Sequence, residues 1–291
     1  MTDSTTVRIL KGTLLMPYGK KSMPVALVIA GSGPTDRNGN SPGLTSDYLK
    51  MLAEGLAAQG IASLRYDKRG VAKSKMVNPN ESSLVIEDFS ADAGSWLDRL
   101  KGDPRFSHIV IVGHSEGSLL FMLAAQRHPA DGFVSLAGAG RPLDVVLKEQ
   151  LKANPNNPLS LVTNANTIID SLKSGHLAKQ IDPLLLGLFR PSVQPFLISW
   201  LKYDPAVEIK KLSIPVMIVQ GTTDIQVLMA DAEALHFASP KARYSVVDGM
   251  NHVLRDAPAE RSANIRTYMQ PDMPINTQLV RTLGEFIQGL R

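Results

Sequence analysis

The stretch that most constrains this chain is residues 109–118, which read Ile-Val-Ile-Val-Gly-His-Ser-Glu-Gly-Ser. Its β-branched apolar start predicts a buried strand, and the leucine, alanine and methionine residues that follow predict a helix. Ser115 would lie at the sharp corner between them, in a Gly-x-Ser-x-Gly pattern. Gly113 and Gly117 flank it because a Cβ at either position would collide with neighbouring backbone. Glycine-rich corners also bind phosphate groups, so this motif alone leaves two interpretations open.

An acid and a histidine follow downstream at positions that suit a serine-based site. A serine hydroxyl is a poor nucleophile at neutral pH and needs a nearby base, which a carboxylate orients. The apolar run 214–221 ends just before Asp224, and His252 lies in the loop after another predicted strand. Each of the three residues would therefore follow its own strand, in the order serine, acid, histidine. Asp248 is a second candidate acid, but its place before the histidine loop favours a local turn contact.

Predicted strands alternate with predicted helices along most of the chain. The strands are expected at residues 7–16, 25–30, 62–66, 109–112, 133–137, 216–219 and 244–247, and the helices at 47–59, 86–100, 118–127 and 277–290. This alternation is typical of an α/β fold, in which helices cover both faces of a mostly parallel sheet. The 291 residues suffice for one large domain with an insertion or for two small domains, and the 44% hydrophobic and 20% charged residues are ordinary for a globular protein.

The stretch 141–212 interrupts this alternation. It contains leucine-rich helical sequence broken by several prolines, and no convincing strand. We expect it to form a helical cap over a core made of residues 1–140 and 213–291. Side chains of the cap would line an acyl pocket, and the residues expected there are Leu185, Phe189, Phe196 and Trp200, together with Gly33 of the core. The alternative is that these apolar side chains only pack within the cap.

A second glycine-rich loop, residues 31–43, follows the predicted strand 25–30. In acyl transfer, the negatively charged oxygen of the tetrahedral intermediate needs hydrogen-bond donors, which form an oxyanion hole. We expect the donors to be the backbone N–H groups of Glu116 and Ser32, with Gly33 as the next choice. Pro34 has no N–H and cannot serve. The loop matches neither Gly-x-Gly-x-x-Gly nor a Walker loop, which argues against a phosphate cradle.

With these residues assembled, the chain resembles the α/β-hydrolase superfamily on both sides of the insertion. Three motifs are similar to its serine-aminopeptidase-like branch, which includes esterases, lipases, thioesterases and some peptidases: Gly-Ser-Gly-Pro-Thr-Asp-Arg-Asn-Gly at 31–39, Arg-Tyr-Asp-Lys-Arg-Gly at 65–70 and Gly-His-Ser-Glu-Gly at 113–117. The resemblance implies Ser115 as nucleophile, Asp224 as acid and His252 as base. One departure is Ala30-Gly31, where these enzymes often have a His-Gly pair. Because the oxyanion donor is a backbone N–H group, this difference affects the shape of the loop more than its chemistry.

These observations predict a serine hydrolase that cleaves carboxylic esters of small to medium acyl length through an acyl-enzyme on Ser115. The same residues could act on a thioester or on an N-terminal peptide bond. A peptidase would need an acidic group in the cap to hold the substrate amine, and the candidates are Glu149, Asp170, Asp182, Asp204 and Glu208. A further alternative is a non-catalytic ligand-binding relative in which the triad only lines a pocket.

Composition and the chain start exclude several function classes. The net charge of +4 is small and the 31 basic residues are scattered, so no nucleic-acid partner is expected. Cysteine is absent, which excludes thiol nucleophiles and disulfides. The first residues lack the pattern of a signal peptide, and no apolar run reaches membrane-spanning length, so we expect a cytoplasmic location. The partner we expect is a small acyl substrate.

We expect the remaining histidines to be structural or solvated, and one aspartate to be structural. His108, His128, His176 and His236 have no acidic or histidine partner at ligand spacing, so neither a metal nor a cofactor is expected. Asp67 is expected to cap a turn or to pair with Lys68 or Arg69. His114 and Glu116, which flank Ser115, are expected to pack against the site or tune it and not to serve as its base.

Overall fold

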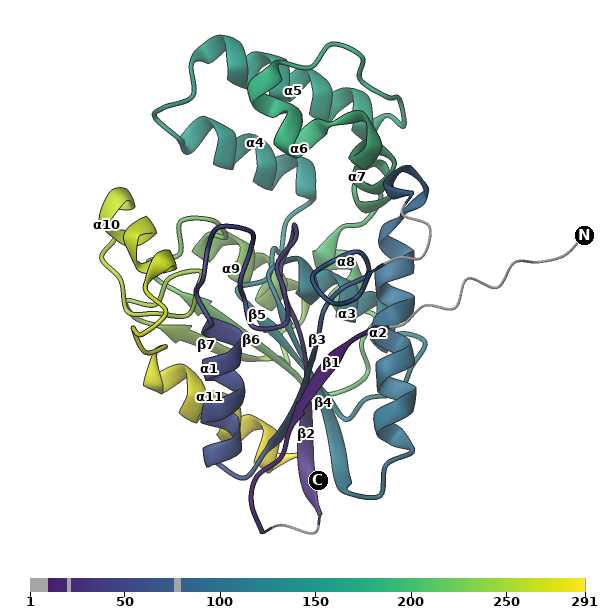
Figure 1. The fold of residues 1–291 in the computed structure, drawn as a ribbon, viewed down its shortest axis with the longest axis vertical. Helices are drawn as coiled ribbons and strands as arrows, with labels where there is room; N and C mark the ends of the chain where they lie inside the picture. The colour runs from purple at the N-terminus through teal and green to yellow at the C-terminus, as the bar shows by residue number, and fades with distance from the viewer. Residues whose placement is uncertain (1–9, 20–21, 76–79, 291) are drawn as a thin grey trace, which may run out of the picture.

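The computed structural model describes residues 10–19, 22–75 and 80–290 and is built around one twisted sheet (Figure 1). The sheet has seven strands in the order β1-β3-β2-β4-β5-β6-β7. They are β1 (Gly12–Leu15), β2 (Met23–Ile29), β3 (Ala62–Tyr66), β4 (Phe106–His114), β5 (Gly132–Leu136), β6 (Val216–Gly221) and β7 (Arg243–Val247). β1 runs antiparallel to β3, and all other neighbours are parallel, which confirms the predicted mostly parallel sheet. Residues 7–9, which were expected to begin the first strand, lie outside the described residues.

The helices follow the predicted alternation and add two that the sequence did not predict. They are α1 (Tyr48–Ala58), α2 (Ile86–Lys101), α3 (Glu116–Ala125), α4 (Leu143–Ala153), α5 (Leu159–Lys173), α6 (Leu186–Phe189), α7 (Gln194–Trp200), α8 (Pro205–Ile209), α9 (Met229–Ala238), α10 (Arg261–Arg266) and α11 (Thr277–Gly289). Short 3₁₀ turns occur at η1 (Glu81–Ser83), η2 (Pro183–Leu185), η3 (Pro191–Val193) and η4 (Thr267–Met269). These two are α9 and α10, and the 6 residues of α10 are too few to display a helical period.

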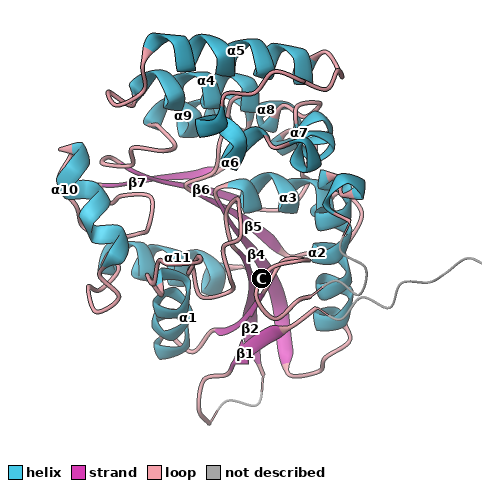
Figure 2. Cartoon of the chain, turned by 45° about the horizontal axis from the view of Figure 1, so that its top comes forward, coloured by secondary structure: helices cyan, strands magenta, loops and turns pink. Residues whose placement is uncertain are grey.

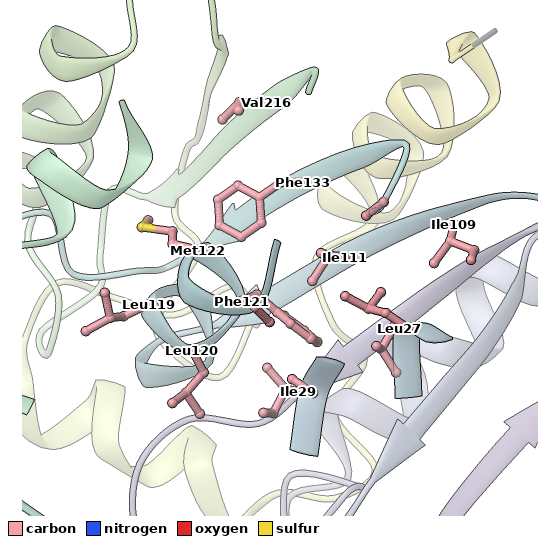
Figure 3. Close-up of a cluster of buried hydrophobic side chains, with 14 of the residues drawn as sticks. Leu27, Ile29, Ile109, Ile111, Leu119, Leu120, Phe121, Met122, Phe133 and Val216 are labelled. Atoms are coloured by element: carbon pink, nitrogen blue, oxygen red, sulfur yellow. The ribbon is translucent and has the colours of Figure 1, made fainter. Parts of the chain in front are cut away.

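Helices cover both faces of the sheet, with α1 and α11 on one side and α2 and α3 on the other (Figures 1 and 2). Side chains alternate along each strand, so Leu27 and Ile29 of β2 enter the cluster under α2 and α3, which Figure 3 shows. Val28 points the other way, into the cluster with Leu52 of α1 and Leu283 of α11. Burial of both faces explains why the strands read as continuous apolar runs.

The carboxyl ends of the parallel strands meet at one edge of the sheet. Ile29 of β2 pairs with Gly113 of β4, and His114 pairs with Leu136 of β5. Gly221 of β6 pairs with Val247 of β7. The loops that carry Ser32, Ser115, Asp224 and His252 all leave from these ends. The sheet therefore gathers the candidate residues at a single edge, as expected for an α/β fold.

Between β5 and β6 the chain forms the helices α4 to α8, which we call the insertion. Helices α4 to α7 have a hydrophobic cluster of their own, to which Leu143, Ile168 and Leu197 contribute. They lie beyond the edge of the sheet, with α4 and α5 farthest out (Figures 1 and 2). α8 differs, because its Ile209 is buried in the cluster of the sheet. By its packing, α8 belongs to the core, although the expected cap boundary at residue 212 includes it.

None of the helices within residues 10–19, 22–75 and 80–290 combines the length and apolar character that crossing a bilayer requires.

Two glycines shape the turn between β4 and α3. A Cβ on Gly113 would lie 2.4 Å from the carbonyl oxygen of Gly117 and 2.6 Å from Cα of Ser118. A Cβ on Gly117 would lie 2.5 Å from the side chain of Ile29 and 2.7 Å from its carbonyl oxygen. Most of these contacts are with backbone, which cannot swing aside. The prediction that both positions require glycine is confirmed.

Gly113→Ala should therefore destabilise the protein strongly. The added methyl group overpacks the turn against rigid backbone, a change that lowers the free energy of unfolding by about 1–3 kcal/mol or more. Gly289→Ala is the matched control, because nothing lies within 4 Å of a Cβ built there. Urea unfolding of the two variants and the wild type measures the difference. Equal stability of the two variants would contradict this account of the turn.

Candidate active site

Ser115 lies at the N-cap of α3 with an unusual backbone conformation, φ 55° and ψ −121°. A non-glycine residue adopts such angles only when its surroundings impose them, at an energy of roughly 1–3 kcal/mol. Here its N–H donates to the carbonyl of Leu136 at 3.0 Å, and the flanking glycines let the chain turn. The side chain is half-buried, and its Oγ has no hydrogen-bond partner among the described residues. The hydroxyl is thus held at the tip of the turn and left free.

His252 and Asp224 form a buried pair. Nδ1 of His252 lies 2.8 Å from Oδ2 of Asp224. The backbone N–H groups of Gln226 and Val227 donate to Oδ1 of Asp224 at 2.8 and 3.0 Å, and they hold the carboxylate in place. Because an ionised carboxylate only accepts, Nδ1 carries the proton and Nε2 of His252 is left as a base.

Asp248, the other candidate acid, makes a different contact. Its Oδ1 accepts a hydrogen bond from the Thr222 hydroxyl at 2.9 Å, which is a local contact between neighbouring loops. In this geometry Asp224 is the carboxylate that orients His252.

His114 connects the turn of Ser115 to the loop of His252. Its Nε2 donates to the backbone carbonyl of His252 at 2.8 Å, and the two rings lie with their centroids 4.8 Å apart. Nδ1 of His114, which is then unprotonated, accepts from the Tyr48 hydroxyl at 3.3 Å. Burial lowers the pKa of His114 to about 3, and the neighbouring His252 adds to this effect. A neutral imidazole therefore bridges the two loops.

The two predicted oxyanion donors belong to Glu116, which follows Ser115 in the chain, and to Ser32, which follows Gly31 in the loop that approaches Ser115. Glu116 is the first residue of α3, so its N–H has no acceptor within the helix. The N–H of Ser32 likewise donates to no described residue. Gly31 allows the Ser32 loop to approach, because a Cβ on Gly31 would lie 3.0 Å from Cβ of Ser115. Gly33, the second choice as donor, follows with φ 72°.

The charged residues after β3 pair differently from the expectation. Asp67 binds Arg37, with Oδ2 2.7 Å from Nη2, and does not pair with Lys68 or Arg69. It also accepts from the backbone N–H of Lys73 at 3.0 Å, in agreement with the expected turn cap. Lys68 instead reaches Glu116, with 2.8 Å between Nζ and Oε1. Arg69 binds Asp92 at 2.6 Å. Their closeness in the sequence suggested that Asp67, Lys68 and Arg69 pair with one another. In the structure each of them pairs with a different part of the chain. Lys68 is the functional candidate that the sequence analysis missed.

A cavity of about 620 Å³ lies between the core and the insertion. Glu116, the residue after Ser115, is part of its wall, whereas Ser115 and His252 are not among the residues that line it. Its wall includes Ser32, Gly33, Lys68 and Glu116 from the core, and Phe196 and Trp200 from α7. Leu185 and Phe189, which were also expected in the pocket, are buried in the cluster of the insertion and do not line this cavity. Their side chains pack inside the insertion, which was the alternative to their lining the acyl pocket.

Three aromatic rings form one rigid apolar wall of the cavity. Phe89 of α2 and Phe196 of α7 meet edge to face, with centroids 5.2 Å apart. Phe196 and Trp200 meet in the same way at 5.8 Å. Edge-to-face pairs of this kind contribute about 0.5–1.5 kcal/mol each beyond the burial of their surface. This wall spans the contact between core and insertion.

Each carboxylate in the cavity wall faces a cation. Glu116 pairs with Lys68, and Glu81 binds Arg190, whose Nε lies 2.9 Å from Oε2. The acidic residues of the insertion are also engaged. Glu149 pairs with Arg141, Asp170 with Lys148 and Glu208 with Lys211, while Asp182 and Asp204 cap η2 and α8. None of these five lines the cavity as described.

The part of the chain that the structure describes holds no group of three or more His, Cys, Asp or Glu side chains placed to bind a metal ion.

Comparison with known proteins adds to this geometry. The sequence matches the family described as serine aminopeptidase, S33, over residues 43–256. The chain belongs to this family of α/β-hydrolases. The esterase EstD of Thermotoga maritima is 31% identical over 256 residues, which are 86% of this chain and 59% of that protein. The chain therefore spans less than two thirds of the length of this relative.

Solved structures of low sequence identity share the fold. Est1E from Butyrivibrio proteoclasticus with bound ferulic acid has a TM-score of 0.63 and 18% identity, covering 97% of this chain and 95% of that one. The esterase EaEST from Exiguobacterium antarcticum has a TM-score of 0.59 and 12% identity, covering 97% of both chains. The predicted α/β-hydrolase fold is confirmed.

Burial of His114 makes the stability of the protein sensitive to acid. The histidine has an ordinary pKa of 6.5 in the unfolded chain and about 3 in the folded one. Below pH 6.5 the unfolded state therefore binds a proton that the folded state does not, and stability falls by up to about 1.4 kcal/mol per pH unit. Between pH 7 and pH 4.5, the free energy of unfolding of His114→Gln, measured in urea, should fall less steeply than that of the wild type. The exposed His176→Gln controls for loss of a histidine, and equal slopes for wild type and His114→Gln would contradict this effect.

Proposed function

We propose that this protein is a serine esterase that uses Ser115 as nucleophile, His252 as base and Asp224 as the carboxylate that orients the base. The observation that carries the proposal is the 2.8 Å pairing of His252 with Asp224, in a loop that His114 ties to the turn of Ser115. Family membership and the similarity to the esterase EstD support the same chemistry. A buried histidine–carboxylate pair, held by His114 near the turn that carries a free serine hydroxyl, supports covalent acyl transfer.

The reaction proceeds in two halves. Oγ of Ser115 attacks the acyl carbon while Nε2 of His252 takes its proton, and Asp224 stabilises the imidazolium. The bond to the leaving oxygen then breaks, and His252 returns the proton to that oxygen. Water repeats the sequence on the acyl-enzyme and releases the acid. Oγ lacks a hydrogen bond in the unliganded protein, which agrees with contacts that tighten when substrate binds.

The negative charge of the tetrahedral intermediate lies between the N–H groups of Ser32 and Glu116. Both groups lack an acceptor among the described residues, and both adjoin Ser115. The N-terminus of α3 adds its partial positive charge at the same point. Donors that are already in place need no reorganisation during the reaction, and this is usually the largest part of such catalysis.

The cavity favours carboxylic esters of small to medium acyl length. Its volume of about 620 Å³ is enclosed on one side by the aromatic wall of Phe89, Phe196 and Trp200. An apolar acyl group packs there without leaving a buried charge unpaired. Ferulic acid, the ligand of Est1E, is itself an aromatic acid, so aryl-containing acyl groups belong in the same test.

An aminopeptidase activity is less well supported than esterase activity. A substrate amine needs a carboxylate that is free to bind it, whereas Glu81 and Glu116 in the cavity wall already face Arg190 and Lys68. Thioesters would use the same catalytic groups as oxygen esters. Their turnover is a separate arm of the substrate test.

Ser115→Ala should abolish hydrolysis of p-nitrophenyl esters. Loss of the nucleophile lowers kcat by several orders of magnitude. Thermal stability should be unchanged, because Oγ makes no hydrogen bond with any described residue. Ser95→Ala, at an exposed serine of α2, is the control and should retain activity. Turnover by Ser115→Ala near the wild-type level would refute the proposal.

Phe196→Ala should shift the preferred acyl length upward. Removing the ring enlarges the cavity, so turnover of octanoate relative to acetate should rise about tenfold, the amount that one or two well-packed methylene groups contribute. Phe237→Ala removes a phenylalanine that is 87% exposed on α9 and serves as the control. The measurement is kcat/KM for p-nitrophenyl esters from acetate to decanoate. An unchanged profile would mean that the acyl group binds elsewhere.

A further inference from the structure

The side chain of Lys68 is an ammonium group buried beside the candidate oxyanion hole. Its side chain is 3% exposed, and Nζ donates to the backbone carbonyl of Gly31 at 2.5 Å and to Oε1 of Glu116 at 2.8 Å. A buried charge is tolerated only where it is paired and hydrogen-bonded. Lys68 satisfies both conditions with two residues that lie 37 and 48 positions away in the chain.

The contact with Gly31 acts directly on one oxyanion donor. The carbonyl of Gly31 and the N–H of Ser32 belong to the same peptide group, which is planar and trans. The two groups point in opposite directions, so a cation that fixes the oxygen also fixes the direction of the N–H. The cation further draws electron density toward the oxygen, which makes the N–H a stronger donor.

The contact with Glu116 acts on the other donor. The carboxylate that Lys68 binds belongs to the residue whose own N–H begins α3. Lys68 therefore ties together the two chain segments that carry the donors. It also neutralises a buried carboxylate which would otherwise repel the negative charge that develops next to Ser115.

We infer that Lys68 is a positioning residue that aligns and polarises the two oxyanion donors, Ser32 N–H and Glu116 N–H. This inference rests on the proposed esterase function, because it assigns those two groups to the oxyanion. It differs from a role in binding the substrate, although Lys68 lines the cavity. A donor that is used mainly in the transition state affects kcat, whereas a contact with the bound ester affects KM.

The test compares two charge-removing double variants. Lys68→Met/Glu116→Gln deletes both charges, so that no unpaired ion remains buried and the protein can fold. Lys211→Met/Glu208→Gln removes a lysine–glutamate pair of the same 2.8 Å length at α8 and is the matched control. We expect the first variant to lose about 10- to 100-fold in kcat for p-nitrophenyl butyrate, less than the loss of a whole donor. Its KM should change less than about threefold, and the control should retain wild-type kinetics.

A second readout separates this inference from the proposed function. A methyl fluorophosphonate reacts with Ser115 by forming a bond from Oγ to phosphorus and expelling fluoride, while the proton passes to His252. The phosphoryl oxygen then occupies the oxyanion position, so this labelling does not depend on knowing the ester. We expect Lys68→Met/Glu116→Gln to be labelled about 10- to 100-fold more slowly than the wild type.

The outcomes are distinguishable. If the wild type hydrolyses no ester but the variant is labelled more slowly, the esterase proposal fails and the positioning role stands. If the folded variant keeps wild-type kcat and labelling rate, or if only KM rises, the positioning role is overturned. A loss of thermal stability with unchanged kcat would mean that the Lys68–Glu116 pair is structural only.

Discussion

The close approach of α3 to the ends of β2 and β4 is the constraint on which the rest of the site depends. Because Gly117 lacks a side chain, the helix begins in contact with the backbone of Ile29. Because Gly113 lacks one, the chain can turn back on itself within a few residues. Ser115 is left in a strained conformation at the tip, and the loop that follows β2 comes to lie beside it. A side chain at Gly113 or Gly117 would collide with this backbone and force the turn to open.

Two side chains then hold the surroundings of Ser115 while its hydroxyl stays free. His114 is neutral, because burial disfavours its charged form, and it donates to the backbone of the His252 loop. Lys68 is charged and finds a carboxylate and a carbonyl. The contact of His114 positions the proposed base, and the contacts of Lys68 position the proposed oxyanion donors. The proposed nucleophile is thus positioned by its neighbours and not by hydrogen bonds of its own.

The insertion has a hydrophobic cluster of its own and a face that closes the cavity. Residues such as Leu185 and Phe189 pack inside it, whereas Phe196 and Trp200 turn toward the core. Because Phe196 also contacts Phe89 of α2, the aromatic wall is continuous across the two parts. The charged pair of Glu81 and Arg190 joins the same two parts. Apolar packing and ion pairing together set the position of the insertion over the site.

The sequence by itself determined where the strands lie along the chain, the glycine-bounded turn and the succession Ser115, Asp224, His252, because these features have local signals: apolar periodicity, missing side chains and positions after strands. Only the tertiary structure decided which apolar residues of the insertion face the cavity, since the inward and outward sides of such short helices look alike in sequence. It also decided that Lys68 binds Glu116 and not its neighbour Asp67. That contact joins residues 48 positions apart, and the physical reason for it, a buried charge that needs a partner, exists only once the chain has folded.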